Sequence, residues 1–408
     1  MLPLLLVFLT QELDAGLARV EITPTVSMPM YGYANRKCGP SAGTHDPLFA
    51  KVLILRSGTA QLGIVTADLG SLVSARLHAE AAKLGIRPLL LAASHSHSSP
   101  AFIPPSVTAE QGAPYQREVE DKILGALREA QRSMFPARFG VGRGEIQAGY
   151  NRLLLRDVGR ARALFDNLER VPLGPIDPEF MVLRVDDRAG NPKAVLVHYA
   201  THSVVLGSTN CQFSADWPGV LQAKLEAEWP GSQAMFVQGA AGDINPLFMA
   251  RSGDEAADFK VMQKMGELFG EDILRTARNI APIASAANGP IQHRSQVLTF
   301  RNRWEKDKTM DVGITTVLIG RDLALAAAPG EFMHKLQRMW KDQADVANPL
   351  FYGYTFSSGG TWAGYVFGAG LAVASLVGIW WTRRTLLSIT SGGMGKKELS
   401  MNDTQNRA

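Results

Sequence analysis

The chain has 408 residues, 46% of them hydrophobic, with a formal net charge of +4 and two cysteines. This length and composition allow a large buried core, arranged as one big domain or as two tightly joined lobes. No long run of basic residues is present, which argues against nucleic acid as a partner.

The amino terminus begins with a short apolar run from Leu2 to Leu9. The run is too short to span a membrane, and it lacks a preceding basic residue and a clean cleavage site. It therefore fits a signal peptide weakly, and we expect such a peptide over residues 1–15.

Apolar runs and helical periodicity indicate a mixed α/β chain. The expected strands are 51–57, 61–67, 88–94, 137–142, 179–186, 193–200, 233–238, 293–301 and 315–328. The expected helices are 72–85, 115–134, 217–229, 256–280 and 332–343. Strands that alternate with helices favour a sheet covered by helices. We therefore predict an α/β fold class, a mixed β-sheet core with helices on its faces, in a single large domain over residues 16–345.

The segment Ser94-His95-Ser96-His97-Ser98-Ser99-Pro100 lies where a short apolar run, 87–93, breaks into a loop. Ligands of α/β folds commonly bind where strands end. If the strand continues into the segment, His95 and His97 point to the same side, because side chains alternate with period two. Two same-facing imidazoles fit a Zn²⁺ site. The alternative is a polar loop with two hydrogen-bonded histidines.

Three later apolar runs also end in polar residues. One ends at His202, one breaks into the turn-like segment 242–246, and one ends at Glu331. Two histidines and a glutamate at strand ends suit a catalytic zinc site with an open position for water. His198, on the run before His202, is interpreted as a core residue or a support for a ligand.

Together these segments resemble the neutral (non-lysosomal) ceramidase family over roughly residues 16–345. The matching segments are Ala18-Arg19-Val20-Glu21-Ile22-Thr23-Pro24, Met30-Tyr31-Gly32-Tyr33, Gly43-Thr44-His45-Asp46-Pro47-Leu48, Asp68, the His-Ser-His segment, Gly149-Tyr150-Asn151-Arg152, Ala200-Thr201-His202, Gly242-Asp243-Ile244-Asn245-Pro246 and Pro329-Gly330-Glu331-Phe332. No single motif decides the match, but the order and spacing make it specific.

The resemblance implies a zinc-dependent amidohydrolase that cleaves the N-acyl amide bond of ceramide or a related N-acyl lipid. It implies four zinc ligands, His95, His202, Glu331 and, as the best candidate for a later tyrosine, Tyr365. It also implies that His97 and Arg152 contact substrate and act in catalysis. Zn²⁺ lowers the pKa of its bound water to about 7 and polarises the amide carbonyl, and His97 or Arg152 then stabilises the oxyanion.

The turn-like segment 242–246 departs from the family pattern at Asn245, where the family has a serine proposed to act in catalysis. Asparagine has no nucleophilic hydroxyl but forms hydrogen bonds, so a zinc-activated water mechanism survives and Asn245 is predicted to position substrate. Asp243 has the best claim to orient a zinc histidine. Two alternatives stay open: a metal-dependent esterase or amidase for a non-sphingolipid substrate, and a catalytically inactive membrane-anchored relative.

The carboxyl-terminal part also departs from the family, whose members carry a further β-sandwich domain that this chain is too short to contain. Residues 346–382 are uncharged, and 363–381 are almost wholly apolar or small, with Arg383 directly beyond them. This predicts a transmembrane helix, a basic then polar, disordered tail over 383–408, and an extracytoplasmic, membrane-anchored enzyme. A buried core segment is the alternative. The helix competes with the assignment of Tyr365 to zinc.

Several remaining residues have less specific assignments. Cys38 and Cys211 are the only cysteines and form at most one disulfide, which the sequence does not decide. Asp46, Asp68 and Asp216 fit turns or helix caps, with support of a zinc histidine as the alternative. Structural or surface positions are assigned to His45, His78, His293 and His334.

Overall fold

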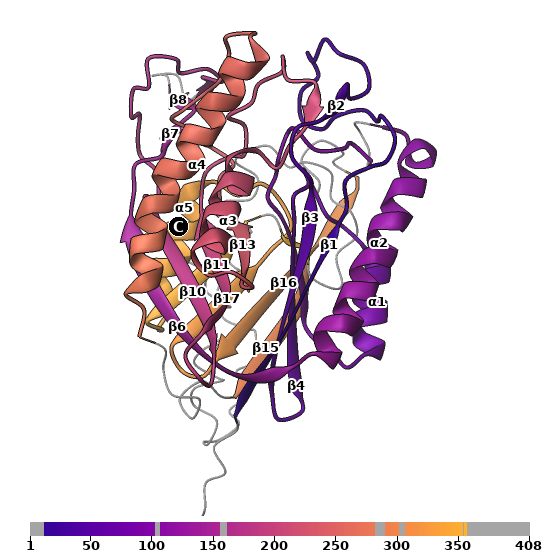
Figure 1. The fold of residues 1–408 in the computed structure, drawn as a ribbon, viewed down its shortest axis with the longest axis vertical. Helices are drawn as coiled ribbons and strands as arrows, with labels where there is room; N and C mark the ends of the chain where they lie inside the picture. Colours follow the sequence, from indigo (N-terminus) through magenta and orange to yellow (C-terminus); the bar gives the residue numbers. More distant parts are fainter. Residues whose placement is uncertain are drawn as a thin grey trace, which may run out of the picture.

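The structure is a computed structural model that describes residues 12–102, 107–155, 161–281, 290–301, 307–353 and 355–356 (Figure 1). Tyr365, the predicted transmembrane helix over 363–381 and the tail over 383–408 therefore lie outside the described residues.

Strands and helices follow one another along the described chain. The strands are β1 (Leu13–Glu21), β2 (Gly43–Thr44), β3 (Phe49–Ser57), β4 (Ala60–Ala67), β5 (Leu89–Ala93), β6 (Phe135–Glu145), β7 (Gly149–Asn151), β8 (Leu153–Leu155), β9 (Ala161–Ala163), β10 (Glu179–Asp187), β11 (Pro192–Tyr199), β12 (Gln212–Phe213), β13 (Gln233–Gln238), β14 (Ile244–Pro246), β15 (Ile291–Arg301), β16 (Thr309–Ile319), β17 (Leu323–Ala327), β18 (Asn348–Tyr352) and β19 (Thr355–Phe356). The helices are α1 (Ala75–Lys83), α2 (Ala109–Arg132), α3 (Asp216–Glu228), α4 (Glu255–Arg278) and α5 (His334–Gln343).

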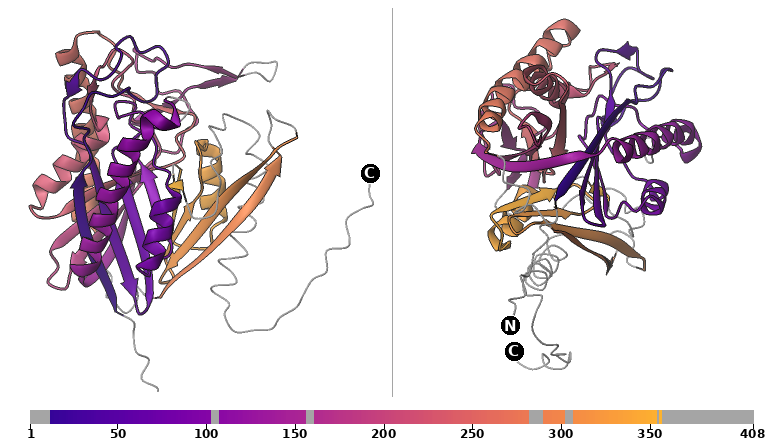
Figure 2. Two further views of the ribbon diagram at one scale, coloured as in Figure 1. Left: turned by 90° about the vertical axis from the view of Figure 1, so that its right-hand side faces the viewer. Right: turned by 60° about the horizontal axis from the view of Figure 1, so that its bottom comes forward.

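A mixed nine-stranded sheet, in the order β13-β11-β10-β6-β1-β3-β4-β5-β19, forms the centre of the fold. The pairs β4–β5 and β11–β13 are parallel, whereas β1–β3, β3–β4, β6–β10 and β10–β11 are antiparallel. Helix α2 packs beside β1 and β3, helix α1 packs beside α2 and β5, and helices α3 and α4 pack beside β13, β10 and β6. Both pairs lie on the same side of the sheet (Figures 1 and 2).

The other face of the large sheet is covered by a four-stranded sheet in the order β15-β16-β17-β18. Along β3, Val52 and Ile54 belong to the cluster under α1 and α2, whereas Leu53 and Leu55 belong to the cluster that includes the four-stranded sheet. Successive side chains of a strand point to opposite faces, so β3 is apolar throughout because both of its faces are buried.

The predicted α/β class, with a mixed sheet and helices in one domain, is confirmed, but the layers differ from the expected arrangement. Helices α1 to α4 cover one face, and a second sheet covers the other (Figure 2). The predicted strand 315–328 is two strands, β16 and β17, joined by a tight turn at Gly320, whose φ is +63°. Periodicity alone does not reveal such a break inside an apolar run.

The amino-terminal boundary also differs from the prediction. Strand β1 begins at Leu13, inside the segment predicted as a signal peptide, and pairs with β3 along its whole length. Leu13 and Ala15 are fully buried in the cluster between the two sheets. The sheet therefore starts before residue 16, because these side chains contribute to its core.

The predicted localisation, an extracytoplasmic enzyme anchored by a transmembrane helix, is contradicted and needs correction. Across the described residues, the structure contains no helix that is both long enough and apolar enough to cross a membrane.

Candidate metal centre

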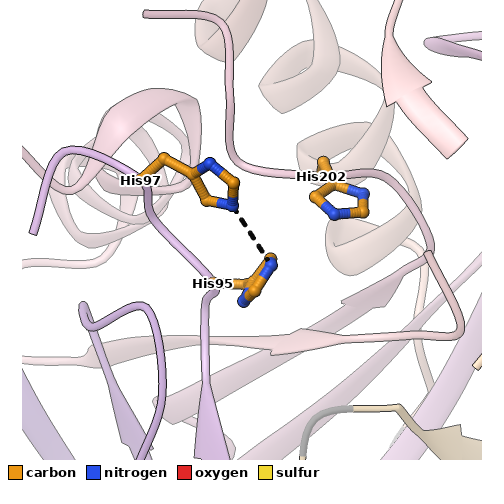
Figure 3. A group of neighbouring side chains, drawn as sticks. All are labelled: His95, His97 and His202. Atoms are coloured by element: carbon orange, nitrogen blue, oxygen red, sulfur yellow. Dashed lines mark hydrogen bonds between the residues drawn. The ribbon is translucent and has the colours of Figure 1, made fainter. Parts of the chain in front are cut away.

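The loop after β5 carries His95 and His97. His95 has a φ of +61°, a left-handed conformation that typically costs a non-glycine residue about 1–3 kcal/mol. The bend means that the loop is not an extension of the strand. The two Nε2 atoms nevertheless lie 3.2 Å apart, and the rings meet edge to face at an interplanar angle of 77° (Figure 3).

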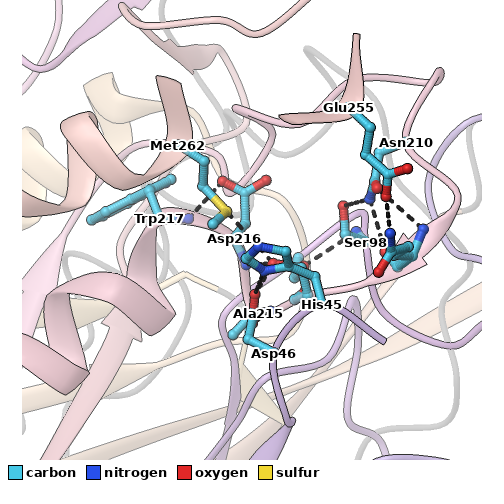
Figure 4. Close-up of polar contacts among 12 residues, drawn as sticks. His45, Asp46, Ser98, Asn210, Ala215, Asp216, Trp217, Glu255 and Met262 are labelled. Atoms are coloured by element: carbon cyan, nitrogen blue, oxygen red, sulfur yellow. Dashed lines mark hydrogen bonds and ion pairs between the residues drawn. The ribbon is translucent and has the colours of Figure 1, made fainter. Parts of the chain in front are cut away.

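The serines of this loop support its backbone. Ser99 Oγ accepts a hydrogen bond from the Gly70 amide at 2.7 Å and donates to the Ser96 carbonyl at 2.8 Å. Ser98 Oγ accepts from Asn210 Nδ2 at 2.9 Å (Figure 4). Because Ser98 and Ser99 are fully buried and hydrogen-bonded, their geometry fits scaffolding and does not fit an accessible nucleophile.

His202 lies in the loop after β11 and turns its ring toward the other two histidines (Figure 3). Its Nδ1 and its backbone amide contact the Ile244 carbonyl at 2.9 and 3.0 Å. His95 Nδ1 lies 2.7 Å from the Gly70 carbonyl. A carbonyl only accepts hydrogen bonds, so both Nδ1 atoms carry the proton, and both Nε2 atoms present a lone pair to the centre.

Glu331 comes from the segment after β17, which belongs to the other sheet. Its Oε1 lies 3.4 Å from His95 Nε2, and its Oε2 lies 3.7 Å from His202 Nε2. Arg152 Nη2 is 3.9 Å from the same Oε2. The structure therefore brings together three residues, His95, His202 and Glu331, that are far apart in sequence.

The donor set fits a zinc ion. The ligand nitrogens of His95, His97 and His202 all lie within 4.8 Å of one another. Tetrahedral zinc with bonds of about 2.1 Å separates neighbouring ligand atoms by about 3.4 Å, close to the distances from Glu331 to His95 and His202. Imidazole and carboxylate are also the ligand types that zinc prefers. His95, His202 and Glu331 are the predicted ligands, and His97 Nε2 adjoins them.

Burial sets the protonation of this centre. Desolvation lowers the pKa of His95 to about 4 and the pKa of His97 well below its usual value, and it also lowers the pKa of His202. Burial raises the pKa of Glu331, but nearby His95, His202 and Arg152 outweigh burial and lower it to about 2. Neutral imidazoles and an ionised carboxylate are the protonation states that bind metal.

Arg152 and Asn245 lie against the same centre. Arg152 Nη1 donates to Asn245 Oδ1 at 3.2 Å, and Nη2 donates to the Gly242 carbonyl at 2.7 Å. Asn245 Nδ2 in turn donates to the Phe165 carbonyl at 3.2 Å. Both side chains are buried. Asn245 therefore fixes the guanidinium of Arg152 beside Glu331.

Asp243 contacts a residue that differs from the predicted one. Its two carboxylate oxygens lie 2.9 Å from the His334 amide and 2.6 Å from His334 Nδ1. The hydrogen bonds that orient His95 and His202 come from backbone carbonyls. His334 was assigned to a structural or surface position, and the sequence signal available was its place three residues after Glu331.

The Tyr31-Gly32-Tyr33 segment was part of the matched pattern, but the sequence did not indicate its contact with His97. The rings of Tyr31 and Tyr33 meet the His97 ring edge-on, with distances between ring centroids of 5.5 and 5.0 Å. Gly32 has a φ of +93°, and a Cβ there would lie 2.2 Å from His97 Cγ. Glycine is therefore required for this close packing.

Three further aspartates stabilise the surrounding loops, and two of them, Asp46 and Asp216, are shown in Figure 4. Asp216 accepts from the amides of Val205, Leu206 and Trp217, and burial raises its pKa to about 6. Asp46 accepts from Ser214 Oγ and from the Ala215 amide. Asp68 accepts from the Phe49 amide and from Gln222. Most of these contacts join segments that are distant in sequence, so the three aspartates cross-link loops and do not act as the expected local turns or helix caps.

The structure also shows the environment of His198 and the pairing of the two cysteines. His198 is fully buried, and its Nε2 lies 2.7 Å from the Phe351 carbonyl, as expected for a core residue. Cys38 and Cys211 form a disulfide with a Cα–Cα distance of 6.0 Å. Beside it, Arg36 donates to the carbonyls of Asn210 and His97. The disulfide therefore joins two loops that border the centre.

The fold and the centre together define an α/β protein with a buried histidine group that could hold a metal ion. The profile of the family described as "Neutral/alkaline non-lysosomal ceramidase, N-terminal" matches residues 14–264. The chain belongs to this family, which confirms the resemblance seen in the sequence.

Comparison with individual proteins agrees with this assignment. The chain is 27% identical over 178 residues to neutral ceramidase A of Dictyostelium discoideum, a match that covers 39% of this chain and 24% of that relative. The fold matches the crystal structure of neutral ceramidase from Pseudomonas aeruginosa with a TM-score of 0.72 and 18% identity, covering 96% of this chain and 77% of that one. A structure described as a ceramidase complexed with C2 matches with a TM-score of 0.65 and 18% identity, and the match covers 85% of this chain and 68% of that one.

Proposed function

We propose that this protein is a zinc-dependent amidohydrolase that cleaves the N-acyl amide bond of ceramide or a related N-acyl lipid. The observation that carries the proposal is the convergence of His95, His202 and Glu331, with Arg152 at the same carboxylate. Family membership and the relatives named as ceramidases support the substrate class. The proposed partner is accordingly an N-acyl lipid.

Zn²⁺, when bound, supplies a Lewis acid for the amide carbonyl and lowers the pKa of water to about 7. His95, His202 and Glu331 hold the ion, and Tyr365 stays a predicted fourth ligand. His97 and Arg152 supply hydrogen-bond donors beside the ion for the negative charge that develops on the substrate oxygen. The planar guanidinium of Arg152 carries only hydrogen-bond donors, and Asn245 keeps it in place.

The protein's own residues favour water over a side chain as the nucleophile. Asn245 offers no hydroxyl, and its amide is occupied by Arg152 and Phe165. Ser98 and Ser99 are buried within the loop scaffold. A covalent acyl adduct on either serine would contradict this mechanism.

The experiment combines zinc analysis with a panel of substrates, applied to the full chain and to His95→Ala, His202→Ala and Tyr365→Phe. We expect about one zinc per chain, hydrolysis of ceramides over simple esters and N-acyl amino acids, and loss of both properties in the histidine variants. Hydrolysis of esters alone supports the non-sphingolipid alternative. Zinc binding without any hydrolysis supports the inactive relative.

A further inference from the structure

The turn that follows β13 contacts three other parts of the candidate centre, namely the Glu331 segment, Arg152 and His202. The Gly242 amide donates to the Phe332 carbonyl at 2.7 Å, next to Glu331. The Gly242 carbonyl accepts from Arg152, and the Ile244 carbonyl accepts from His202. A Cβ at Gly242 would lie 2.6 Å from the Glu331 carbonyl oxygen, so only glycine permits this approach. Residues 242–245 therefore link the two sheets at the centre.

Helix α5 starts at His334, immediately after the Glu331 segment, and Asp243 lies at its amino terminus. The residue before the helix, Met333, provides no side-chain cap. Asp243 takes this place from a distant part of the chain, because its Oδ1 accepts from the His334 amide and its Oδ2 accepts from His334 Nδ1. Asn151 Nδ2 also donates to Asp243, at 3.2 Å. A carboxylate at a helix amino terminus is favoured by the helix dipole.

We propose that the Asp243–His334 pair is a positioning clamp that holds the Glu331 carboxylate at the metal site. Glu331 is the one predicted ligand among the described residues that comes from the four-stranded sheet side, beyond the segment 14–264 matched by the family profile. The clamp fixes the backbone three residues after Glu331, and the Gly242–Phe332 hydrogen bond fixes it one residue after Glu331. This inference rests on the proposed function only in treating Glu331 as a metal ligand.

The first test measures zinc affinity of the full chain by competition with a chelator. Residues that orient ligands typically change metal affinity by about 10–100-fold, and we expect such a loss for His334→Ala and Asp243→Asn. His334→Asn keeps an N–H donor near the position of Nδ1 and is expected to restore most of the affinity. If the Asp243–His334 pair only stabilised the fold, His334→Ala would lower the melting temperature, and His334→Asn would not restore the zinc affinity.

A matched control exists in His45, which contacts Asp46 through Nδ1 at 2.7 Å and is stacked on Phe259. His45→Ala also removes a histidine–aspartate contact, but one outside the centre. We expect it to leave zinc affinity unchanged. Equal losses in His45→Ala and His334→Ala would overturn the proposal.

The second test needs no metal and follows amide hydrogen exchange in the metal-free protein. Loss of the clamp should speed exchange at His334 and at Gly242, whose amides donate across the contact. If the wild-type chain binds no zinc, the metal-dependent function fails, while faster exchange at these amides still supports the clamp. Unchanged exchange and unchanged affinity in folded His334→Ala would overturn the clamp and leave the proposed function intact.

Discussion

The two sheets contribute to the candidate centre in different ways. Loops after β5 and β11 of the nine-stranded sheet carry His95, His97 and His202, and backbone carbonyls orient His95 and His202. Among the described residues, the four-stranded sheet contributes only Glu331, and contacts with residues 242–243 hold its segment in place. The histidine group is therefore built within one layer, whereas the complete ligand set depends on how the two layers pack.

The largest expected effect compares one ligand from each layer. His95→Ala and Glu331→Gln should each reduce zinc content from about one ion per chain to near zero, since each removes a predicted ligand. Both proteins should stay folded, which circular dichroism checks. Retention of zinc by Glu331→Gln would show that the three histidines suffice and that the second sheet supplies no ligand.

The next effect concerns the donors beside the ligands. Removing a donor that stabilises an oxyanion typically lowers kcat by about 10²–10³-fold, and we expect this range for Arg152→Ala. Asn245→Ala should cause a smaller loss, because Arg152 keeps its hydrogen bond to the Gly242 carbonyl. Steady-state kinetics with zinc content measured in parallel separates this effect from metal loss. Equal losses in both variants would contradict the supporting position assigned to Asn245.

Removing the Cys38–Cys211 disulfide tests whether the loops on the nine-stranded sheet must be covalently joined for the candidate centre to keep its structure. The Cys38–Cys211 bond closes a loop with a sequence separation of 173 residues, and loss of a native disulfide typically costs about 2–5 kcal/mol of stability. The Cys38→Ser, Cys211→Ser double variant should unfold at lower denaturant concentration and should retain its zinc ligands. A loss of zinc at an unchanged midpoint would indicate that the bond orders the centre and contributes little to the fold.

The smallest expected effect is on the pH dependence of the unfolding free energy, and it comes from the buried residue His198. Burial lowers the pKa of His198 from 6.5 to about 4. The unfolded state then binds the proton first, so stability is full above about pH 6.5 and falls as pH drops toward about 4. His198→Gln removes this titration and keeps a donor for the Phe351 carbonyl. Its slope of unfolding free energy against pH should be lower by up to about 1.4 kcal/mol per pH unit in that window, measured by denaturant titration. An unchanged slope would contradict a neutral buried His198.

Some features could be predicted because they depend on local sequence. Apolar runs located strands such as β3 and β13, and helical periodicity located α2 and α4. The order of short motifs identified the family, which the profile match confirms. The site residues His95, His202 and Glu331 were selected by strand-end position and resemblance, and in the structure the Glu331 oxygens lie 3.4 Å from His95 Nε2 and 3.7 Å from His202 Nε2.

Other features were missed because they depend on contacts between distant segments. Strand β1 was overlooked because its start lay within an apparent leader, whereas its pairing with β3 and its burial define it as a strand. The predicted partner of Asp243 was wrong because the carbonyls of Gly70 and Ile244 already accept from His95 and His202, and Asp243 instead accepts from His334. The predicted membrane-anchored localisation rested on composition, and the described residues contain no helix that is long and apolar enough to cross a membrane.

Most element types, the family and the chemical nature of the candidate ligands follow from the amino-acid sequence, since periodicity and side-chain chemistry are local properties. The packing of the whole chain was needed to show that helices cover one face of the large sheet and a second sheet covers the other. Only it decided that Cys38 pairs with Cys211 and that Asp243 holds His334. These choices depend on which buried polar groups find partners and which apolar faces meet, and both are fixed when the whole chain packs.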